Sequence, residues 1–384
     1  MKVTIFQYRL FHYRQRLFEL MREKCIAAGI DLNLVYGQPY GDEIKKKDSV
    51  ELPWGIKVKS LYFPIKEKKD LCWQPAPASV RDSDLFVFMH ENRLLANYWW
   101  LLRRSLGLGP KVAFWGHGRD FQSSAPGGLR EKWKSLTLNW PDWWFAYTGL
   151  TRQIVQAAGF PEERITVINN AIDNEEFVGE LAAVDEAALA ALRTETGFGV
   201  DDFVAIYCGS LYTEKRIDQL LEIAEQLHQR QPSFRLLIIG DGALRSQVEA
   251  HVGSRPWIAY LGAAHGARKA TCFRLSKLLL CPGAVGLNIL DSFIAGTPLV
   301  TMKSAKHGPE IGFLEHGSNG CMIDDSAEQY IDQVERLIAE PAELARLQRG
   351  AQIAAQEYTV DRMAERFVDG LRAALADRRQ EQTA

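Results

Sequence analysis

Residues 276–301 read SKLLLCPGAVGLNILDSFIAGTPLVT, and this stretch decides the fold. The apolar run Leu278–Leu280 predicts a buried strand, Pro282–Gly286 predicts a glycine-rich turn, and the residues from Leu287 onward predict a helix. A second apolar strand is expected at Leu299–Thr301. Strand, loop, helix and strand in this order are typical of a parallel β-α-β unit. Its loop lies at the carboxyl end of a strand, where open α/β sheets bind their ligands.

The loop and the helix start in this stretch suit an anionic ligand. Gly283 and Gly286 let a ligand approach the backbone closely, since glycine has no Cβ. The free N–H groups at the start of a helix favour negative charge. A nucleoside diphosphate is therefore the ligand that we expect. Many glycine-rich turns bind no ligand, so the prediction of a phosphate site depends on the neighbouring motifs.

Composition divides the chain into a basic, aromatic first half and an acidic second half. Residues 1–168 hold 25 Lys and Arg against 17 Asp and Glu, together with nine of the ten Trp. A length of 384 residues predicts two domains rather than one core. Six scattered cysteines without a C-x-x-C pair favour a reducing cytoplasm. We find no secretory signal and no apolar run long enough to span a membrane. We therefore expect a cytoplasmic protein, soluble or resting on the inner face of the cytoplasmic membrane.

Strand and helix patterns alternate along the whole chain, which predicts an α/β fold of parallel sheets with helices on both faces. We expect residues 1–168 to form a first Rossmann-like domain. Residues 169–200 are expected to be a connection with an Ala-rich helix. Residues 201–358 are expected to form a second Rossmann-like domain, and residues 359–384 a final helix and tail.

A second loop with the same character follows the expected strand Phe203–Cys208. Gly209 and Ser210 come directly after that strand, and Lys215 stands just before the next helix. Main-chain donors and one cation at this place suit a diphosphate. A solvated loop lysine is the plainer alternative. The expected position in the same sheet as the 283–288 loop favours binding.

Five segments in the right order resemble the motifs of GT-B glycosyltransferases of the large retaining family 4. They are VINNAID (167–173), GSLYTEKRID (209–218), LIIGDG (237–242), the stretch 281–298, and HGPEI (307–311) followed by Asn319 and Gly320. The resemblance covers about residues 167–323 and is weaker over 1–166. It implies two Rossmann-like domains that face each other across a cleft, with the final helix crossing back to the first domain.

The resemblance also implies a reaction. A sugar would move from a nucleotide-diphosphate donor (a UDP-, GDP- or similar sugar) to a glycan or lipid-linked acceptor, with retention at the anomeric carbon. This is the hexosyltransferase type of EC 2.4, in bacterial cell-surface polysaccharide or lipopolysaccharide biosynthesis. No cofactor and no metal are implied. The expected partners are the donor, the acceptor and an anionic membrane surface, without nucleic acid.

Carried over position by position, the resemblance implies a donor site of eight residues: Gly209, Ser210, Lys215, Gly286, Leu287, Asn288, Asp291 and Glu310. Lys215 would bind the diphosphate, and Asp291 stands where the second acid of the family pair binds the ribose hydroxyls. Gly283 occupies the position of the first acid, which contacts the donor sugar, so that specificity does not carry over. Glu310 is the substitute that we consider for it.

In the first domain, the resemblance implies a catalytic role for His117, which follows the expected strand Lys111–Trp115 between two glycines. A histidine at that strand end would lie near the donor sugar. A structural histidine bonded to backbone is the alternative. Arg9 and Arg119 are weaker candidates for contact with the acceptor or with phosphate, and His90, after another strand, is a weaker candidate for the reaction centre.

Two other functions stay open. A nucleotide-sugar 2-epimerase shares the fold but would need more acid and base groups around the sugar than we identify. A non-catalytic GT-B subunit that binds nucleotide or glycan is favoured by Gly283. Asp82 and Asp84 spell a D-x-D motif outside the fold in which it binds metal, so no metal is predicted from them.

Six tryptophans of the basic half suggest a surface that contacts anionic lipid: Trp99, Trp100, Trp133, Trp140, Trp143 and Trp144. Tryptophan favours the headgroup level of a membrane, and Lys and Arg are drawn to anionic lipid. The alternative is that several of these side chains belong to the core of the first domain.

Overall fold

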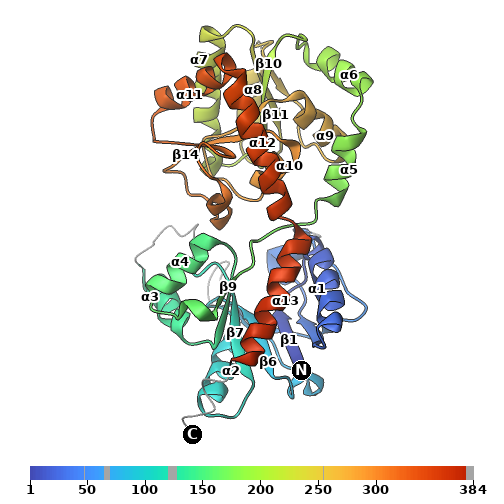
Figure 1. The fold of residues 1–384 in the computed structure, drawn as a ribbon, viewed down its shortest axis with the longest axis vertical. Coiled ribbons are helices and arrows are strands. Elements are labelled where there is room, and N and C mark those ends of the chain that lie inside the picture. The colour runs from blue at the N-terminus through green and yellow to red at the C-terminus, as the bar shows by residue number, and fades with distance from the viewer. Residues whose placement is uncertain (47, 65–69, 120–127, 254, 378–384) are drawn as a thin grey trace. The chain divides into compact units, whose positions relative to one another are not determined.

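The computed structural model describes residues 1–46, 48–64, 70–119, 128–253 and 255–377. The chain forms two compact units (Figure 1). The first unit comprises residues 1–173 together with 360–384, and the second comprises residues 174–359. The last helix therefore belongs to the first unit. Each unit is described by itself below.

The first unit is built on a parallel sheet with the strand order β3-β2-β1-β6-β7-β8-β9. Its strands are β1 (Lys2–Gln7), β2 (Asp31–Tyr36), β3 (Ile56–Lys57), β6 (Leu85–Met89), β7 (Lys111–Gly116), β8 (Trp143–Ala146) and β9 (Ile165–Val167). An antiparallel hairpin of β4 (Leu61–Pro64) and β5 (Asp70–Trp73) stands apart from it. The order reverses between β1 and β6, which is the point where doubly wound sheets bind ligands.

Helices cover both faces of this sheet, as right-handed crossovers between parallel strands require. They are α1 (Gln15–Ala27), α2 (Leu95–Ser105), α3 (Leu129–Leu136), α4 (Gly149–Ala157) and α13 (Val360–Ala376), with short 3-10 turns η1 (His12–Arg14), η2 (Gly41–Lys46), η3 (Ala78–Val80), η4 (Thr137–Asn139) and η5 (Glu162–Arg164). One face buries an aromatic core that includes Phe86, Trp100 and Trp144.

On the other face, α13 packs beside α1 and against β8 and β9 (Figure 1). Phe367 of α13 stacks on Phe145 at 4.3 Å between ring centroids and meets Trp115 edge to face at 5.0 Å. Gly370 makes this approach possible, since a Cβ there would lie 2.5 Å from Thr166 Oγ1 and 2.6 Å from Phe145 Cε1. A helix that returns from the end of the chain thus completes the first unit.

The second unit has a parallel sheet in the order β12-β11-β10-β13-β14-β15. Its strands are β10 (Phe203–Cys208), β11 (Phe234–Ile239), β12 (Ile258–Tyr260), β13 (Leu278–Cys281), β14 (Leu299–Met302) and β15 (Gly320–Ile323). Its helices are α5 (Glu175–Ala183), α6 (Glu186–Thr196), α7 (Ile217–Arg230), α8 (Arg245–Val252), α9 (Gly266–Leu275), α10 (Asn288–Ala295), α11 (Ala327–Ala339) and α12 (Pro341–Glu357), with the 3-10 turns η6 (Thr213–Lys215) and η7 (Pro309–Phe313).

The expected α/β fold with two Rossmann-like sheets is confirmed. The expected connection 169–200 differs from what is observed. Both α5 and α6 pack against α9, so most of that segment is part of the second unit. The sequence predicted the Ala-rich helix α6 but neither α5 nor the packing partner of the two helices, which lies about 80 residues further along the chain.

Candidate functional site

The two loops predicted to bind a diphosphate meet in the second unit. They follow β10 and β13, which are hydrogen-bonded neighbours at the point where the strand order reverses. The Ala284 N–H donates to the Glu214 carbonyl at 2.8 Å, and the Asn288 Nδ2 donates to the Cys208 carbonyl at 3.4 Å. The loops therefore form one interlocked structure at the carboxyl edge of the sheet.

Gly283 is the tightest point of this structure. A Cβ on it would lie 2.2 Å from the carbonyl carbon of Lys215 and 2.3 Å from its oxygen. No side chain fits there without moving the 209–216 loop. The first acid of the family pair therefore could not be restored by a single substitution at position 283, because the loop geometry itself excludes a glutamate there.

Lys215 is buried, with 7% of its surface exposed, and its ammonium donates to the Ala284 carbonyl at 2.5 Å. An ammonium has three donors, and this bond uses one of them. The Tyr212 ring lies 5.7 Å from the same nitrogen. The loop that follows β13 therefore holds in place the Lys215 side chain, which is predicted to bind the diphosphate.

Gly209 and Ser210 are supported from behind by the LIIGDG segment that follows β11. Gly240 and Gly242 have positive φ, and a Cβ on either would collide with the carbonyl oxygens of Gly209 and Leu211, at 1.8 and 2.3 Å. The Leu211 N–H donates to the Asp241 carbonyl at 2.9 Å. These glycines are needed because the two loops run in direct backbone contact.

Arg216 is a residue that the sequence analysis missed. It stands where the family motif has glycine after the lysine, and it adopts the left-handed conformation with φ of 52°. For a residue with a Cβ this conformation costs about 1–2 kcal/mol. Its guanidinium donates to Ser304 Oγ at 2.9 Å, beyond the end of β14. The mismatch with the motif was the signal that could have identified it.

Gly286, Leu287 and Asn288 form the predicted helix start. The Asn288 side chain accepts from the Gly286 N–H at 3.1 Å, and Leu287 is the residue before the first turn of α10. A Cβ on Gly286 would meet nothing within 4 Å, so the backbone faces open space at this point. The N-terminus of α10 is thus accessible, as an anion site requires.

Asp291, predicted to hold the ribose, lies on the first turn of α10 and pairs with Lys269 of α9, at 2.7 Å between carboxylate and ammonium. The side chains are 13% and 21% exposed. Burial raises the pKa of Asp291 above its ordinary value, although the Lys269 charge opposes this shift. The Lys269 ammonium also lies 4.4 Å from the centroid of the Phe177 ring. Lys269 was missed because nothing in its own helix marks it.

Glu310 is buried in η7, beside the loop that follows β13. A Cβ on Gly308 would lie 2.7 Å from Glu310 Oε2, and the Gly308 N–H donates to the Val285 carbonyl at 2.8 Å. Next to it, His307 Nδ1 accepts from the Val285 N–H at 3.1 Å, so its Nε2 carries the proton and donates to the Met302 carbonyl at 2.8 Å. Burial lowers the pKa of His307. His307, a third missed residue after Arg216 and Lys269, holds the loop from its other side.

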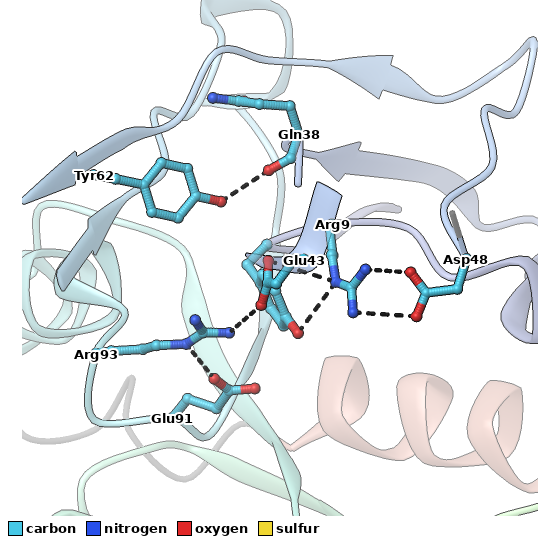
Figure 2. Close-up of polar contacts among 8 residues, drawn as sticks. Arg9, Gln38, Glu43, Asp48, Tyr62, Glu91 and Arg93 are labelled. Atoms are coloured by element: carbon cyan, nitrogen blue, oxygen red, sulfur yellow. Dashed lines mark hydrogen bonds and ion pairs between the residues drawn. The ribbon is translucent and has the colours of Figure 1, made fainter. Parts of the chain in front are cut away.

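In the first unit, Arg9 lies in a network of charges where β1 and β6 end (Figure 2). It is 3% exposed, and its guanidinium binds both oxygens of Asp48, at 2.5 and 3.3 Å, while Nε lies 3.7 Å from Glu43. The prediction that Arg9 contacts acceptor or phosphate remains untested. The contacts observed give it a structural role.

The same network includes Arg93 and Glu91, which follow β6. Arg93 Nε donates to Glu91 at 2.8 Å, and Arg93 Nη2 lies 3.7 Å from Glu43 (Figure 2). The Arg93 guanidinium also lies 4.2 Å from the centroid of the Tyr8 ring. Burial raises the pKa of the Tyr8 hydroxyl. Three carboxylates thus face two guanidinium groups, which makes this edge of the sheet a poor match for a phosphate and a better match for hydroxyl groups.

His117, the predicted catalytic residue, is half-buried at the end of β7 and stacks on Tyr147, with ring centroids 4.0 Å apart. Below it, the buried Arg14 donates to the Tyr147 hydroxyl at 3.4 Å and to Asn170 Oδ1 at 2.6 Å. Arg119 is exposed beyond it. The role of His117 in catalysis stays a prediction.

His90, the weaker candidate, is buried and bonded to Thr137 Oγ1 at 2.9 Å. Asp82 pairs with the Lys2 ammonium at 2.6 Å, and Asp84 accepts from the Lys2 N–H at 2.7 Å. These two acids therefore secure the start of β1. In the described part of the chain, no group of three His, Cys, Asp or Glu side chains is arranged as a metal site.

Comparison with known proteins agrees with this arrangement. The family model described as "Glycosyl transferases group 1" matches residues 202–340. A Bacillus subtilis (strain 168) protein named as the glycosyltransferase EpsD is 25% identical over 278 residues, which are 68% of this chain and 69% of that protein. Residues 202–340, which the family model matches, contain both interlocked loops.

Solved structures share the fold over nearly the whole chain. The crystal structure of Anabaena Alr3699/HepE in complex with UDP has a TM-score of 0.67 at 16% identity and covers 97% of this chain and 100% of that one. The lipopolysaccharide outer core galactosyltransferase WaaB has a TM-score of 0.65 at 12% identity, with 97% and 99% covered. The chain is thus a glycosyltransferase of the GT-B fold, and its residues 202–340 form the group 1 domain.

Proposed function

We propose that this glycosyltransferase takes a sugar from a nucleotide-diphosphate donor and passes it, with retention and without a metal, to a glycan or lipid-linked acceptor of a bacterial surface polysaccharide. The observation that carries this proposal is the interlocked pair of loops after β10 and β13, where Lys215 lies beside the open N-terminus of α10. A cation beside an accessible helix start at a sheet's reversal point suits a diphosphate.

The donor would lie along this edge of the second unit. Its diphosphate would contact Lys215 and the backbone around Gly286, and its ribose hydroxyls would bond to Asp291, which can accept two of them. HepE, a structural neighbour, has been crystallised with UDP and with UDP-glucose, which supports a uridine donor as the first choice. Glu310 is the buried carboxylate that we propose near the sugar in place of the acid that Gly283 excludes.

The reaction needs charge stabilisation more than covalent help. As the bond between the anomeric carbon and the diphosphate oxygen breaks, negative charge grows on the diphosphate. Preorganised N–H groups and the Lys215 ammonium would stabilise that charge at the moment it develops. Both loops are prepared for this task, because the Ala284 carbonyl already holds the Lys215 ammonium and His307 already holds the loop after β13. We propose that His117 is the catalytic residue that the first unit contributes to the reaction centre.

The acceptor class is proposed from the relatives. WaaB is named for the lipopolysaccharide outer core and EpsD as a glycosyltransferase, and a 24% identical relative of Acholeplasma laidlawii is an alpha-monoglucosyldiacylglycerol synthase, matched over 43% of its length. These names support a glycan or lipid-linked acceptor, and we propose that the protein meets it at the inner face of the cytoplasmic membrane. Among the helices that the structure describes, none is both long and apolar enough to cross a bilayer.

The test is direct. The purified protein is incubated with UDP- and GDP-sugars and bacterial lipid-linked glycans, with and without EDTA, and nucleotide release is measured. We expect acceptor-dependent release that EDTA does not reduce, and NMR of the product should show the anomeric configuration of the donor. Lys215→Ala serves as the matched inactive control. Loss of release in EDTA, or an inverted product, would contradict the metal-free retaining mechanism.

The strongest alternative is a non-catalytic subunit that binds nucleotide or glycan. Its support is Gly283, at which the loop geometry leaves no room for the sugar-contacting acid. Such a protein would bind nucleotide and release none with any acceptor. An epimerase would instead change a free nucleotide sugar without an acceptor, which the same incubation detects.

A further inference from the structure

The structure divides the six tryptophans of the basic half into two groups. Trp100, Trp143 and Trp144 are buried in the first unit, and they are core residues rather than surface residues. Trp99, Trp133 and Trp140 are 45%, 45% and 42% exposed. For large aromatic side chains this is unusual exposure, because burying them would contribute more free energy than burying almost any other side chain.

The exposed tryptophans are accompanied by exposed leucines. Trp99 and Leu102 of α2 and Leu106, the residue directly after it, are spaced by three and four residues, so they share one side of the helix. Leu102 and Leu106 are 53% and 63% exposed, and Leu108 in the following turn is 60% exposed. An amphipathic helix normally turns such a stripe toward the core. Here the stripe faces solvent.

The neighbouring helix continues this surface. Trp133 of α3 donates from Nε1 to the Tyr98 hydroxyl of α2 at 3.0 Å, and its ring lies 5.6 Å from that of Trp140. Leu136 between them is 57% exposed. We call the set Trp99, Leu102, Leu106, Leu108, Trp133, Leu136 and Trp140 the aromatic face. It combines two adjoining elements of the first unit into one apolar surface.

A pocket of about 370 Å³ opens beside Trp99. Trp73, Trp99 and Trp100 form its aromatic walls, and Arg81 and Arg103 provide its charge. The Arg103 guanidinium lies over both Trp99 and Trp100, at 6.0 and 5.5 Å from the ring centroids. Among its lining residues, all within the described ranges, there is no carboxylate. The pocket therefore suits an anionic group attached to an apolar body.

The charges around the face favour the same kind of partner. Lys132 is exposed on α3 next to Trp133, whereas the adjacent Glu131 is buried. The acids nearest to Arg81 in sequence, Asp82 and Asp84, are bonded to Lys2. Exposed Trp and Leu among Arg and Lys are the composition of a surface that lies in the headgroup region of a bilayer.

We propose that the aromatic face rests on an anionic lipid bilayer, with a lipid headgroup phosphate in the pocket of Arg103. The Trp rings would lie at the headgroup level, the leucines just below it, and Arg103 and Lys132 would meet the anionic headgroups. This surface belongs to the first unit and is separate from the donor loops. Binding to lipid thus does not depend on the sugar-transfer reaction.

The test mixes the full-length protein with vesicles of phosphatidylcholine alone or with about 30% phosphatidylglycerol. Each mixture is measured at roughly 0.05 and 0.5 M salt, because the higher salt concentration screens charges much more strongly. We expect co-sedimentation with the anionic vesicles at low salt and release at high salt. Tryptophan emission should shift to the blue on binding. The double variant Trp99→Ala, Trp133→Ala should bind roughly tenfold or more weakly.

Charge is tested separately. Arg103→Gln should weaken binding to anionic vesicles about fivefold, as expected for one cation near the surface. The matched controls are Arg152→Gln on α4 and Ile26→Ala on α1, exposed residues of the same unit that lie outside the face. Both controls should bind as the unaltered protein does. A thermal shift with UDP on every sample confirms folding and tests the donor site independently.

Three outcomes would overturn the proposal. The protein could remain in the supernatant with all vesicles at both salt concentrations. The face variants could bind as well as the two controls. The face could instead join two copies of the chain, which would appear as a concentration-dependent dimer that Trp99→Ala abolishes in the absence of lipid.

Discussion

Asp291 lies where burial disfavours the negative charge of its carboxylate. Burial raises its pKa, and the Lys269 ammonium at 2.7 Å opposes that shift. Lys269→Met would keep the apolar stem over Phe177 and remove the charge, so the pKa of Asp291 should rise further. Because a protonated acid is a poorer partner for ribose, we expect nucleotide affinity to fall more at pH 6 than at pH 8, as measured by calorimetry.

The control for this prediction is Lys277→Met, an exposed lysine after the same helix, which should leave affinity unchanged at both pH values. An equal loss of affinity at pH 6 and pH 8 in Lys269→Met would show that Lys269 contributes packing and not charge.

Lys215 is expected to dominate the affinity for the diphosphate. Lys215→Ala removes a charge-assisted contact of roughly 1.5–3 kcal/mol, which is about a 10- to 150-fold rise in Kd for the nucleoside diphosphate. The Ala284 carbonyl also loses its donor, so a small drop in Tm is expected. Unchanged affinity in a folded variant would remove Lys215 from the donor site.

Two buried histidines should make the protein sensitive to acid. Burial lowers the pKa of His90 and of His307, so the unfolded chain binds more protons than the folded chain as pH falls below about 6.5. The free energy of unfolding should therefore be constant above about pH 7 and decline below about 6.5. Urea denaturation at four pH values measures this, and His307→Gln should flatten the decline. A free energy of unfolding that rises toward pH 5 would contradict the lowered pKa of these two histidines.

At this scale, sequence motifs located the donor loops, and the structure brought Lys215, Asn288 and Glu310 to the same edge of one sheet. Lys269, His307 and Arg216 were not found, because each acts on a residue of another element. A motif reports position along the chain and not which side chain faces it across a helix pair. Contacts of that kind come from packing.

At the scale of elements, Gly370 sets how closely α13 lies to β8 and β9. Gly370→Ala would place a methyl group against Thr166, whose hydroxyl is fixed by the Trp143 Nε1 donor at 2.9 Å, and against Phe145. Overpacking of this kind costs about 1–3 kcal/mol, more than the helix propensity that alanine gains. We expect the free energy of unfolding of the first unit to fall by this amount in urea titrations.

The matched control is Gly179→Ala on α5, where an added Cβ would meet nothing within 4 Å. At that position only helix propensity changes, so we expect the free energy of unfolding of the second unit to rise by about 0.5–1 kcal/mol. If both substitutions stabilised the protein, the close approach of α13 would not be rigid.

The alternation of strands and helices was readable from the sequence because buried parallel strands are continuous apolar runs. Which tryptophans are core and which are surface was not readable. Trp99 and Trp100 are neighbours in one helix, and a rotation of one residue along α2 exposes the first and buries the second. Periodicity gives the spacing of a face, and packing decides which face turns inward.

At the scale of the whole molecule, the first unit depends on the end of the chain. Met363, Phe367 and Leu371 of α13 are fully buried there, and each would contribute about 1.5–3 kcal/mol. Removal of residues 360–384 should therefore unfold the first unit and leave the second unit folded and able to bind nucleotide. Calorimetry should show one transition lost and one kept. Loss of both transitions would mean that the second unit does not stay folded without the first.

The returning helix also fixes the order in which the molecule can mature on the ribosome. Residues 174–359 are an unbroken segment, so the second unit has all its parts before α13 is synthesised. The unit that starts the chain has to wait for its final seventeen-residue helix. Until then Trp115 and Phe145 lack the Phe367 ring that covers them. The nascent protein thus exposes these aromatic rings until α13 has been synthesised, and chaperones bind apolar surface of this kind.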